Sequence, residues 1–181
     1  MASTTRQRLP IIPNIGHYSR ALSFYKMDDI YFGIGKTTEW QEDETSDPNF
    51  IPPEPDVDAV SLEELVGLKK CSKKFLVVPD ENGTIEYADT NWRIVDESEA
   101  KELKAHWVFL ESVFSFEDFT ATDYRQLGIF SRVKRAEGVE DKDILQIPEI
   151  EDVGVLEVLC NRHINTRQSG VRDVYQMIIE F

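Results

Sequence analysis

The sequence has little cysteine and no long apolar run, and each shortage excludes a class of protein. Two cysteines in 181 residues are too few for a disulfide framework. No stretch approaches the roughly 18 consecutive apolar residues that a membrane-spanning helix needs. The first eight residues carry positive charge, but Pro10 and Pro13 interrupt the apolar run that a signal peptide would have. We therefore expect a protein made and folded in a cytoplasm, with Cys71 and Cys160 as buried thiols; a single bridge between them is the less favoured alternative.

Basic residues are also scarce. Lys and Arg number 20 against 34 Asp and Glu, so the formal net charge is −14. Nucleic-acid binding draws much of its affinity from cations that neutralise phosphates, and anionic membrane surfaces attract basic proteins. The charge balance therefore argues against both kinds of partner. Hydrophobic residues make up 41% of the chain, which is too high for disorder, and the length suits one ordinary domain.

Residues 39–58 differ from the rest of the chain. They hold eight acidic residues, no basic residue and four prolines. Proline lacks the backbone N–H and fixes φ, which excludes a regular helix or a central strand. We expect a long excursion loop that is pinned at a few points by Trp40, Phe50 and Ile51. Its acidic run at residues 42–47 could attract a cation, although a solvated acidic loop is the usual meaning of such a run.

A few short segments carry helix signals. Residues 16–27 place apolar side chains at helical spacing, and a helix there would begin near Asn14 or Gly16. A second short helix is predicted over residues 61–70, because an N-capping serine and two glutamates open this segment and two lysines close it. Residues 98–104 are expected to form a polar helical turn or a loop.

The remaining patterned segments favour strands. Asn82-Gly83 lies between two apolar runs, which predicts a hairpin over residues 75–87, since both residues tolerate positive φ. Aromatic and β-branched residues predict further strands at residues 30–34, 91–95, 105–116, 120–133, 153–159 and 174–181. The expected fold class is α+β, mainly an antiparallel β sheet or sandwich with a few short helices and a long Pro/acidic loop. We expect a single domain over residues 1–181, with an N-terminal arm at residues 1–14.

Gly35-Lys36-Thr37 matches part of a phosphate-binding loop. The full pattern needs a glycine five positions before Gly35, where Ile30 stands. Carboxylates follow at the place where a helix N-terminus should hold the phosphates. We therefore interpret the segment as the end of a strand whose glycines allow close packing. A nucleotide-using enzyme is the least favoured functional class.

No other motif indicates chemistry. Residues 78–89 overlap an EF-hand pattern, but Val78 and Asp89 stand at the first and last ligand positions, so a turn is the better interpretation. The three histidines are far apart in the sequence and lack the spacing of metal ligands. No nucleophile elbow occurs. We expect no catalytic, cofactor-binding or metal-binding residue and no cofactor.

One succession of segments resembles a known family. In chain order the segments are Phe24-Tyr25, residues 31–40, the acidic residues 42–47 and Pro52-Pro53-Glu54-Pro55-Asp56. This succession resembles the N-terminal region of the baseplate wedge subunits of contractile-tailed bacteriophages of the T-even type. Residues 59–70 look like the short helix with a basic end that follows in such proteins. Residues 124–130 and 177–181 are similar to two of their strands.

The resemblance implies a non-enzymatic structural protein of the virion, in the wedge of a contractile tail baseplate, assembled in the host cytoplasm. Its partners would be other baseplate wedge or tail proteins, with a homodimer left open. Another tail or neck adaptor, or a fibre-attachment protein, is the alternative. We hypothesise that residues 39–58 pack across the protein's own sheet or onto an adjacent subunit. The candidate interface and anchor residues are Trp40, Phe50, Pro52, Pro53, Pro55, Tyr124, Arg125 and Phe181.

Overall fold

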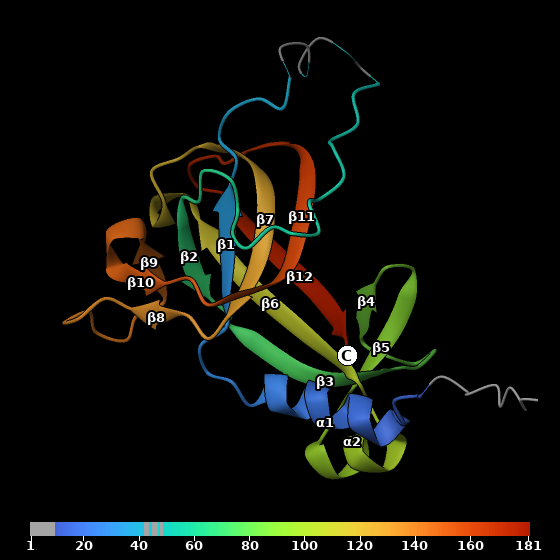
Figure 1. Ribbon diagram of the computed structural model, residues 1–181. Coiled ribbons are helices and arrows are strands. Elements are labelled where there is room, and N and C mark those ends of the chain that lie inside the picture. Colours follow the sequence, from blue (N-terminus) through green and yellow to red (C-terminus); the bar gives the residue numbers. More distant parts are fainter. Residues whose placement is uncertain (1–9, 42–43, 45–46, 48) are drawn as a thin grey trace, which may run out of the picture. The chain divides into compact units, whose positions relative to one another are not determined.

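The computed structural model describes residues 10–41, 44, 47 and 49–181 (Figure 1). The described residues fall into two compact units. The first unit comprises the described residues up to Lys26 together with Phe75–Phe109 and Ile178–Phe181, and the second comprises Met27–Lys74 and Leu110–Met177. The single domain over residues 1–181 stays a prediction, and residues 1–9 of the expected N-terminal arm lie outside the described residues.

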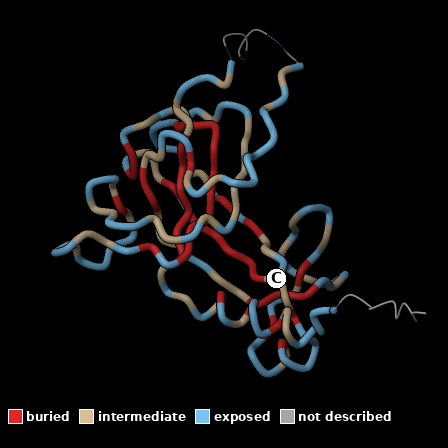
Figure 2. The backbone as a smooth tube through the Cα atoms, viewed as in Figure 1, coloured by how far each residue is buried: buried red, intermediate tan, exposed pale blue. Residues whose placement is uncertain are grey.

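A five-stranded sheet forms the body of the second unit. Its strand order is β11-β7-β1-β2-β9, and every neighbouring pair is antiparallel. The strands are β1 (Tyr31–Gly35), β2 (Gly67–Lys70), β7 (Asp123–Ser131), β9 (Ile144–Gln146) and β11 (Val155–Thr166). Buried residues gather on β1 and β7, whereas β11 has only half-buried and exposed residues (Figure 2). The fully buried side chains include Phe32, Ile34, Leu68, Ile129, Phe130 and Leu145.

Smaller elements complete the second unit. They are the antiparallel pair β8 (Lys134–Arg135) and β10 (Ile150–Asp152), and the 3-10 helices η1 (Phe116–Asp118) and η2 (Ile147–Glu149). At the centre of the five-stranded sheet Gly33 of β1 lies opposite Gly128 of β7. A Cβ atom at Gly33 would lie 2.8 Å from the ring of Phe130, so the missing side chain makes room for that aromatic ring.

The second large sheet has the order β12-β6-β3-β5-β4. Its strands are β3 (Lys73–Pro79), β4 (Ile85–Tyr87), β5 (Thr90–Val95), β6 (Trp107–Ser115) and β12 (Arg172–Glu180). Residues of β3, β6 and β12 are divided between the two units, and the first unit contains the two α-helices, α1 (Asn14–Tyr25) and α2 (Glu97–Leu103). Tyr18, Ala21 and Phe24 are the buried face of α1, whereas Leu22 and Tyr25, which share the predicted apolar stripe with Tyr18 and Ala21, are half-buried. Antiparallel sheets and two short α-helices confirm the predicted β-rich α+β class.

The helix predicted over residues 61–70 is wrong. Residues 67–70 form strand β2, and Glu64 has a φ of 47°, which lies outside the helical region. Strand β2 pairs with β1 on one side and with β9 on the other, and Leu68 is fully buried between them. The backbone hydrogen bonds of β2 to both neighbouring strands, together with burial of its apolar side chains, outweigh the local helix signals, because local propensity decides structure only weakly.

The hairpin predicted over residues 75–87 is also wrong in its pairing. Strand β5 lies between β3 and β4, so the Asn82-Gly83 turn connects strands that are not neighbours. The tight hairpin joins β4 to β5 through Ala88 and Asp89, at φ values of 50° and 58°. Gly83 packs closely against β5: a Cβ atom at this position would lie 2.4 Å from the backbone of Trp92, so a side chain would not fit there.

Candidate interaction surface

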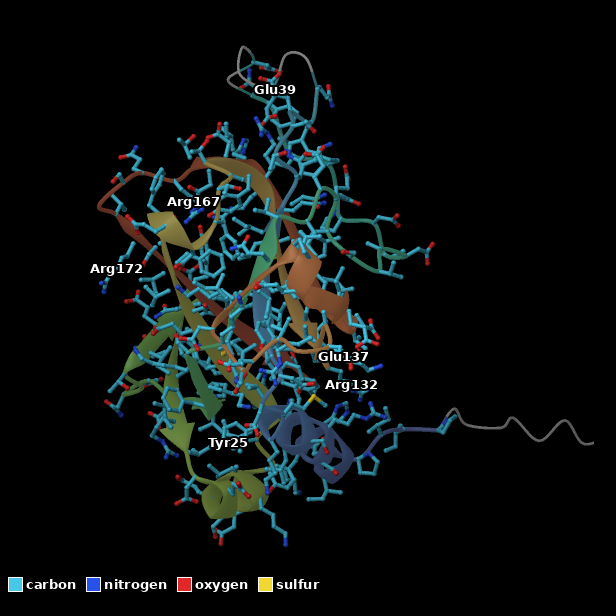
Figure 3. The ribbon with its side chains drawn as sticks, turned by 90° about the vertical axis from the view of Figure 1, so that its left-hand side faces the viewer. Tyr25, Glu39, Arg132, Glu137, Arg167 and Arg172 are labelled. Atoms are coloured by element: carbon cyan, nitrogen blue, oxygen red, sulfur yellow. The ribbon has the colours of Figure 1, made fainter. Side chains whose placement is uncertain are left out.

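The chain between β1 and β2, residues 36–66, is largely exposed and supplies the candidate surface (Figure 2). Its described residues form neither helix nor strand. Figure 1 shows this 36–66 segment running out beyond the strand ends and returning across the sheet, and Figure 3 places Glu39 in its outer part. The predicted cation-attracting run at residues 42–47 falls mostly outside the described residues.

A buried ion pair fixes the 36–66 segment to β7. Arg125 Nε lies 2.8 Å from Glu44 Oε1 and 2.7 Å from Glu44 Oε2, and the two side chains are only 3% and 2% exposed. Arg125 Nη1 donates to the carbonyl of Thr37 at 2.8 Å, and the carboxylate of Glu44 also accepts the backbone N–H of Trp40 at 2.9 Å. Removing one partner of such a pair would leave an uncompensated buried charge, so each residue keeps the other in place.

Three further contacts join the 36–66 segment to β11. The indole N–H of Trp40 donates to the carbonyl of Arg162 at 3.1 Å. The ring of Phe50 meets His163 edge-on, with the ring centroids 6.0 Å apart. The side-chain amide of Asn161 donates to the carbonyl of Pro53 at 3.0 Å. Residues that are more than a hundred positions apart in the chain therefore hold the segment at several points.

The Gly-Lys-Thr sequence binds a carboxylate of its own chain. The backbone N–H groups of Thr37 and Thr38 donate to Glu64 Oε2 at 2.9 and 3.0 Å, and the two hydroxyls donate to the same carboxylate at 2.6 and 2.5 Å. These hydrogen bonds, first of all those of the threonine hydroxyls, lower the pKa of Glu64 to about 2. A Cβ atom at Gly35 would lie 2.5 Å from the carbonyl oxygen of Glu63, which confirms the close packing expected there.

A groove of about 450 Å³ lies between the returning part of the 36–66 segment and strands β7 and β11. We call it the acidic groove. Apolar side chains of its lining include Trp40, Leu62 and Leu159, and acidic ones are Glu54, Asp56, Asp58 and Glu63. Lys36 Nζ pairs with Glu63 at 3.0 Å. Within the part of the chain that the structure describes, no basic side chain pairs with the other three carboxylates.

The candidate interface residues divide between exposed and buried positions. Pro53 and Pro55 are exposed, Pro52 is half-buried, and Trp40 and Phe50 contact β11. Tyr124 is fully buried on β7, its ring 6.4 Å from that of Tyr175, and Arg125 is buried against Glu44.

Phe181 belongs to the first unit, apart from the other candidates. Its ring lies 4.9 Å from that of Phe24. Its backbone N–H donates to the carbonyl of His106 at 2.9 Å, and its backbone oxygen accepts from His17 Nδ1 at 2.5 Å. The structure therefore brings together Trp40, Phe50 and Pro53 at β11 in the second unit, whereas Phe181 belongs to the first unit.

Sequence analysis did not single out several polar residues that position this surface. Gln126 is 3% exposed; its Oε1 accepts from the backbone of Glu63 at 2.7 Å, and its Nε2 donates to Asn161 at 2.9 Å. The sequence signal that could have revealed Gln126 is the polar pair Arg125-Gln126, which stands among the mainly apolar residues of this strand. Buried polar groups almost always have partners, so such a pair indicates contacts from elsewhere in the chain.

Arg167, labelled in Figure 3, is a second buried cation that the sequence did not reveal. It is 3% exposed and donates to the carbonyls of Ser115, Phe119 and Ala121, the last two at 3.1 and 3.0 Å. Burial lowers the pKa of its guanidinium. Arg167 therefore holds the connection between β6 and β7 closed around η1.

Three findings concern sites of other kinds. Cys71 and Cys160 are free and half-buried, and burial raises the pKa of both thiols. Among residues 10–41, 44, 47 and 49–181, no three His, Cys, Asp or Glu side chains are grouped so as to hold a metal ion. The same residues contain no helix that is long and apolar enough to span a membrane.

Comparison with known proteins defines the class of the chain, which is that of structural proteins of a phage tail. A family model described as "Baseplate wedge 3 tail fiber network component" matches residues 9–181, and the chain belongs to this family. It is also 26% identical over 152 residues to "Virion protein 3" of Enterococcus phage phiEF24C, which covers 81% of this chain and 80% of that protein. These matches confirm the resemblance to baseplate wedge subunits.

Proposed function

We propose that the protein is a wedge subunit of a contractile tail baseplate that links neighbouring baseplate proteins through protein–protein contacts. It does so without catalysis or a cofactor, as a single domain that assembles in the host cytoplasm. The observation that carries this proposal is the 36–66 segment, which is anchored by a buried ion pair and still presents much of its length to solvent. Because anchoring and prolines restrict the segment before it docks, less conformational entropy is lost on binding.

Exposed apolar side chains on the segment support a docking role. Ile51, Val57 and Val60 are 80%, 96% and 79% exposed. Three such side chains within ten residues gain little from folding of the subunit, whereas a partner would remove them from water. The family description names a tail fibre network, so proteins of that network are the partners we expect first.

The proposal is tested in a phage whose copy of this gene is supplied in trans. A Val57→Ser/Val60→Ser variant should fold with an unchanged melting temperature, because both side chains are exposed, and should lower the yield of tails with complete baseplates. Val171→Ser is the matched control, since Val171 is 49% exposed outside the segment. Normal baseplate yield with the double variant would contradict a linking role for the segment.

Two alternatives are separated by other measurements. Density for this chain in the neck of an intact particle, in place of the baseplate, would favour an adaptor function. A rise in melting temperature with millimolar ATP and magnesium would favour a nucleotide-binding enzyme. We expect no rise, because the carboxylate of Glu64 already accepts the hydrogen bonds of Thr37 and Thr38.

A further inference from the structure

The chain contains a second unusual surface, at the start of α1. Ile11, Ile12 and Ile15 are 85%, 46% and 48% exposed. Together we call them the isoleucine patch. In the sequence they belong to residues 1–26, which include four Lys or Arg and no Asp or Glu, and one of these cations, Lys26, pairs with Glu97 at 2.8 Å. The buried face of α1 consists of other residues, so the isoleucine patch is not needed to hold this helix in its unit.

The acidic groove has the opposite character. Its wall carries Trp40 and Leu159, which offer apolar contact, and three carboxylates that lack a basic partner among the described residues. An occupant with aliphatic side chains and flanking positive charge would bury the apolar atoms and neutralise these carboxylates. The isoleucine patch has both properties, and it occurs in the same chain.

We propose that the acidic groove of one copy receives the isoleucine patch of a second copy, so that copies of this chain associate head to tail. The contact joins two different surfaces, and therefore each pair leaves one free groove and one free patch for further copies. Opposite charges speed and orient such an association and make it sensitive to salt. This inference rests on the proposed function and names one neighbour of the subunit in the assembly.

The first experiment measures self-association of the full chain by sedimentation velocity across the micromolar range. The weight-average mass should rise with concentration at low salt and fall back towards the monomer at high salt. Asp56→Lys/Asp58→Lys should weaken the association at least tenfold, which is about 1.4 kcal/mol. Ile12→Ser/Ile15→Ser should weaken it to a similar degree. Glu86→Lys, an exposed charge reversal on β4, is the control and should leave it unchanged.

A mixing experiment distinguishes head-to-tail contact from a symmetric interface. The groove variant keeps an intact isoleucine patch and the patch variant keeps an intact groove. Neither should associate alone, whereas an equimolar mixture should form one-to-one dimers and nothing larger. An interface in which the groove meets the groove, or the patch meets the patch, would give no such recovery, and a reciprocal dimer with two groove–patch contacts would stop the wild-type mass at that of a dimer.

Several results would overturn the inference. They are a wild-type chain that stays monomeric at every concentration, an association that both variants leave intact, and a failure of the mixture to dimerise. If the isolated chain is monomeric while Val57→Ser/Val60→Ser still impairs baseplates, the proposed function stands and the self-association is refuted. All variants change exposed side chains, so we expect each of them to fold, and circular dichroism spectra are the check.

Discussion

Arg125 on β7 and Glu44, 81 positions earlier in the chain, bury their charges against one another with an Nε–Oε2 distance of 2.7 Å. The pair connects the most acidic part of the sequence with the core of the sheet. Glu44 is one of the eight acidic residues in residues 39–58, and its buried ion pair stabilises the fold of the subunit itself. Other acids of the same stretch, such as Glu54, Asp56 and Asp58, are exposed.

Removing one member of this pair should destabilise the protein strongly. Glu44→Ala leaves the Arg125 guanidinium buried without a counter-charge, which typically costs about 3–5 kcal/mol. Urea unfolding measures the change. Lys134→Ala removes an exposed ion pair with Asp152 and should cost at most about 1 kcal/mol. The double variant Glu44→Leu/Arg125→Met should recover much of the loss, since no charge stays buried; equal loss in the single and double variants would argue against the pair as the cause.

Glu64 should make stability depend on pH in the acid range. Its folded-state pKa of about 2 lies below the ordinary value of 4.5, so the stabilisation is fully present above about pH 4.5 and is lost as the pH falls towards 2. The carboxylate is more than a third exposed, so solvent screening limits the effect to about 1 kcal/mol.

The variant Glu64→Gln tests this directly. Its deficit in unfolding free energy relative to the wild type should be greatest at neutral pH and should shrink between pH 4.5 and pH 2. Thermal unfolding of both proteins at several pH values provides the measurement. A deficit that is the same at every pH would mean that the hydrogen bonds do not depend on the ionised form.

Gly35 should not tolerate even a methyl group. In Gly35→Ala the new Cβ would lie 2.5 Å from the carbonyl oxygen of Glu63 and 2.8 Å from Cβ of Leu62, so the backbone must shift. Overpacking of this kind costs about 1–3 kcal/mol. Gly138→Asn is the control, because nothing lies within 4 Å of its added Cβ and Asn tolerates the positive φ of 82°. Melting temperatures that fall equally in both variants would contradict this explanation.

Both cysteines should titrate as slow-reacting thiols. Burial raises the pKa of Cys71 and Cys160, and the thiolate is the reactive form. In denaturant without reductant, a thiol-specific disulfide reagent should react with two groups per chain at once. In the native protein near neutral pH the reaction should be many times slower. Two missing thiols in denaturant would instead indicate a bridge between them.

Local spacing predicted those elements whose signal lies within a few residues. The helical pattern of residues 16–27 corresponds to α1, and the polar residues 98–104 to α2. Aromatic and β-branched runs correspond to β1, β6, β7 and β12, because a side chain's preference for a pleated, half-buried surface is a local property. Composition also marked residues 39–58 as different from the rest of the chain.

Pairing and burial were decided by residues far apart in the chain. Residues 67–70 carry helix signals but become a strand because β1 and β9 flank them, and β5 separates the two strands that the Asn82-Gly83 turn connects. Nothing in the sequence near Glu44 indicates that this acid, unlike the exposed Glu39 and Asp47, meets a buried arginine. Sequence spacing specifies which faces of an element are apolar, whereas the partner of each face, and hence the acidic groove, exists only after distant segments have packed together.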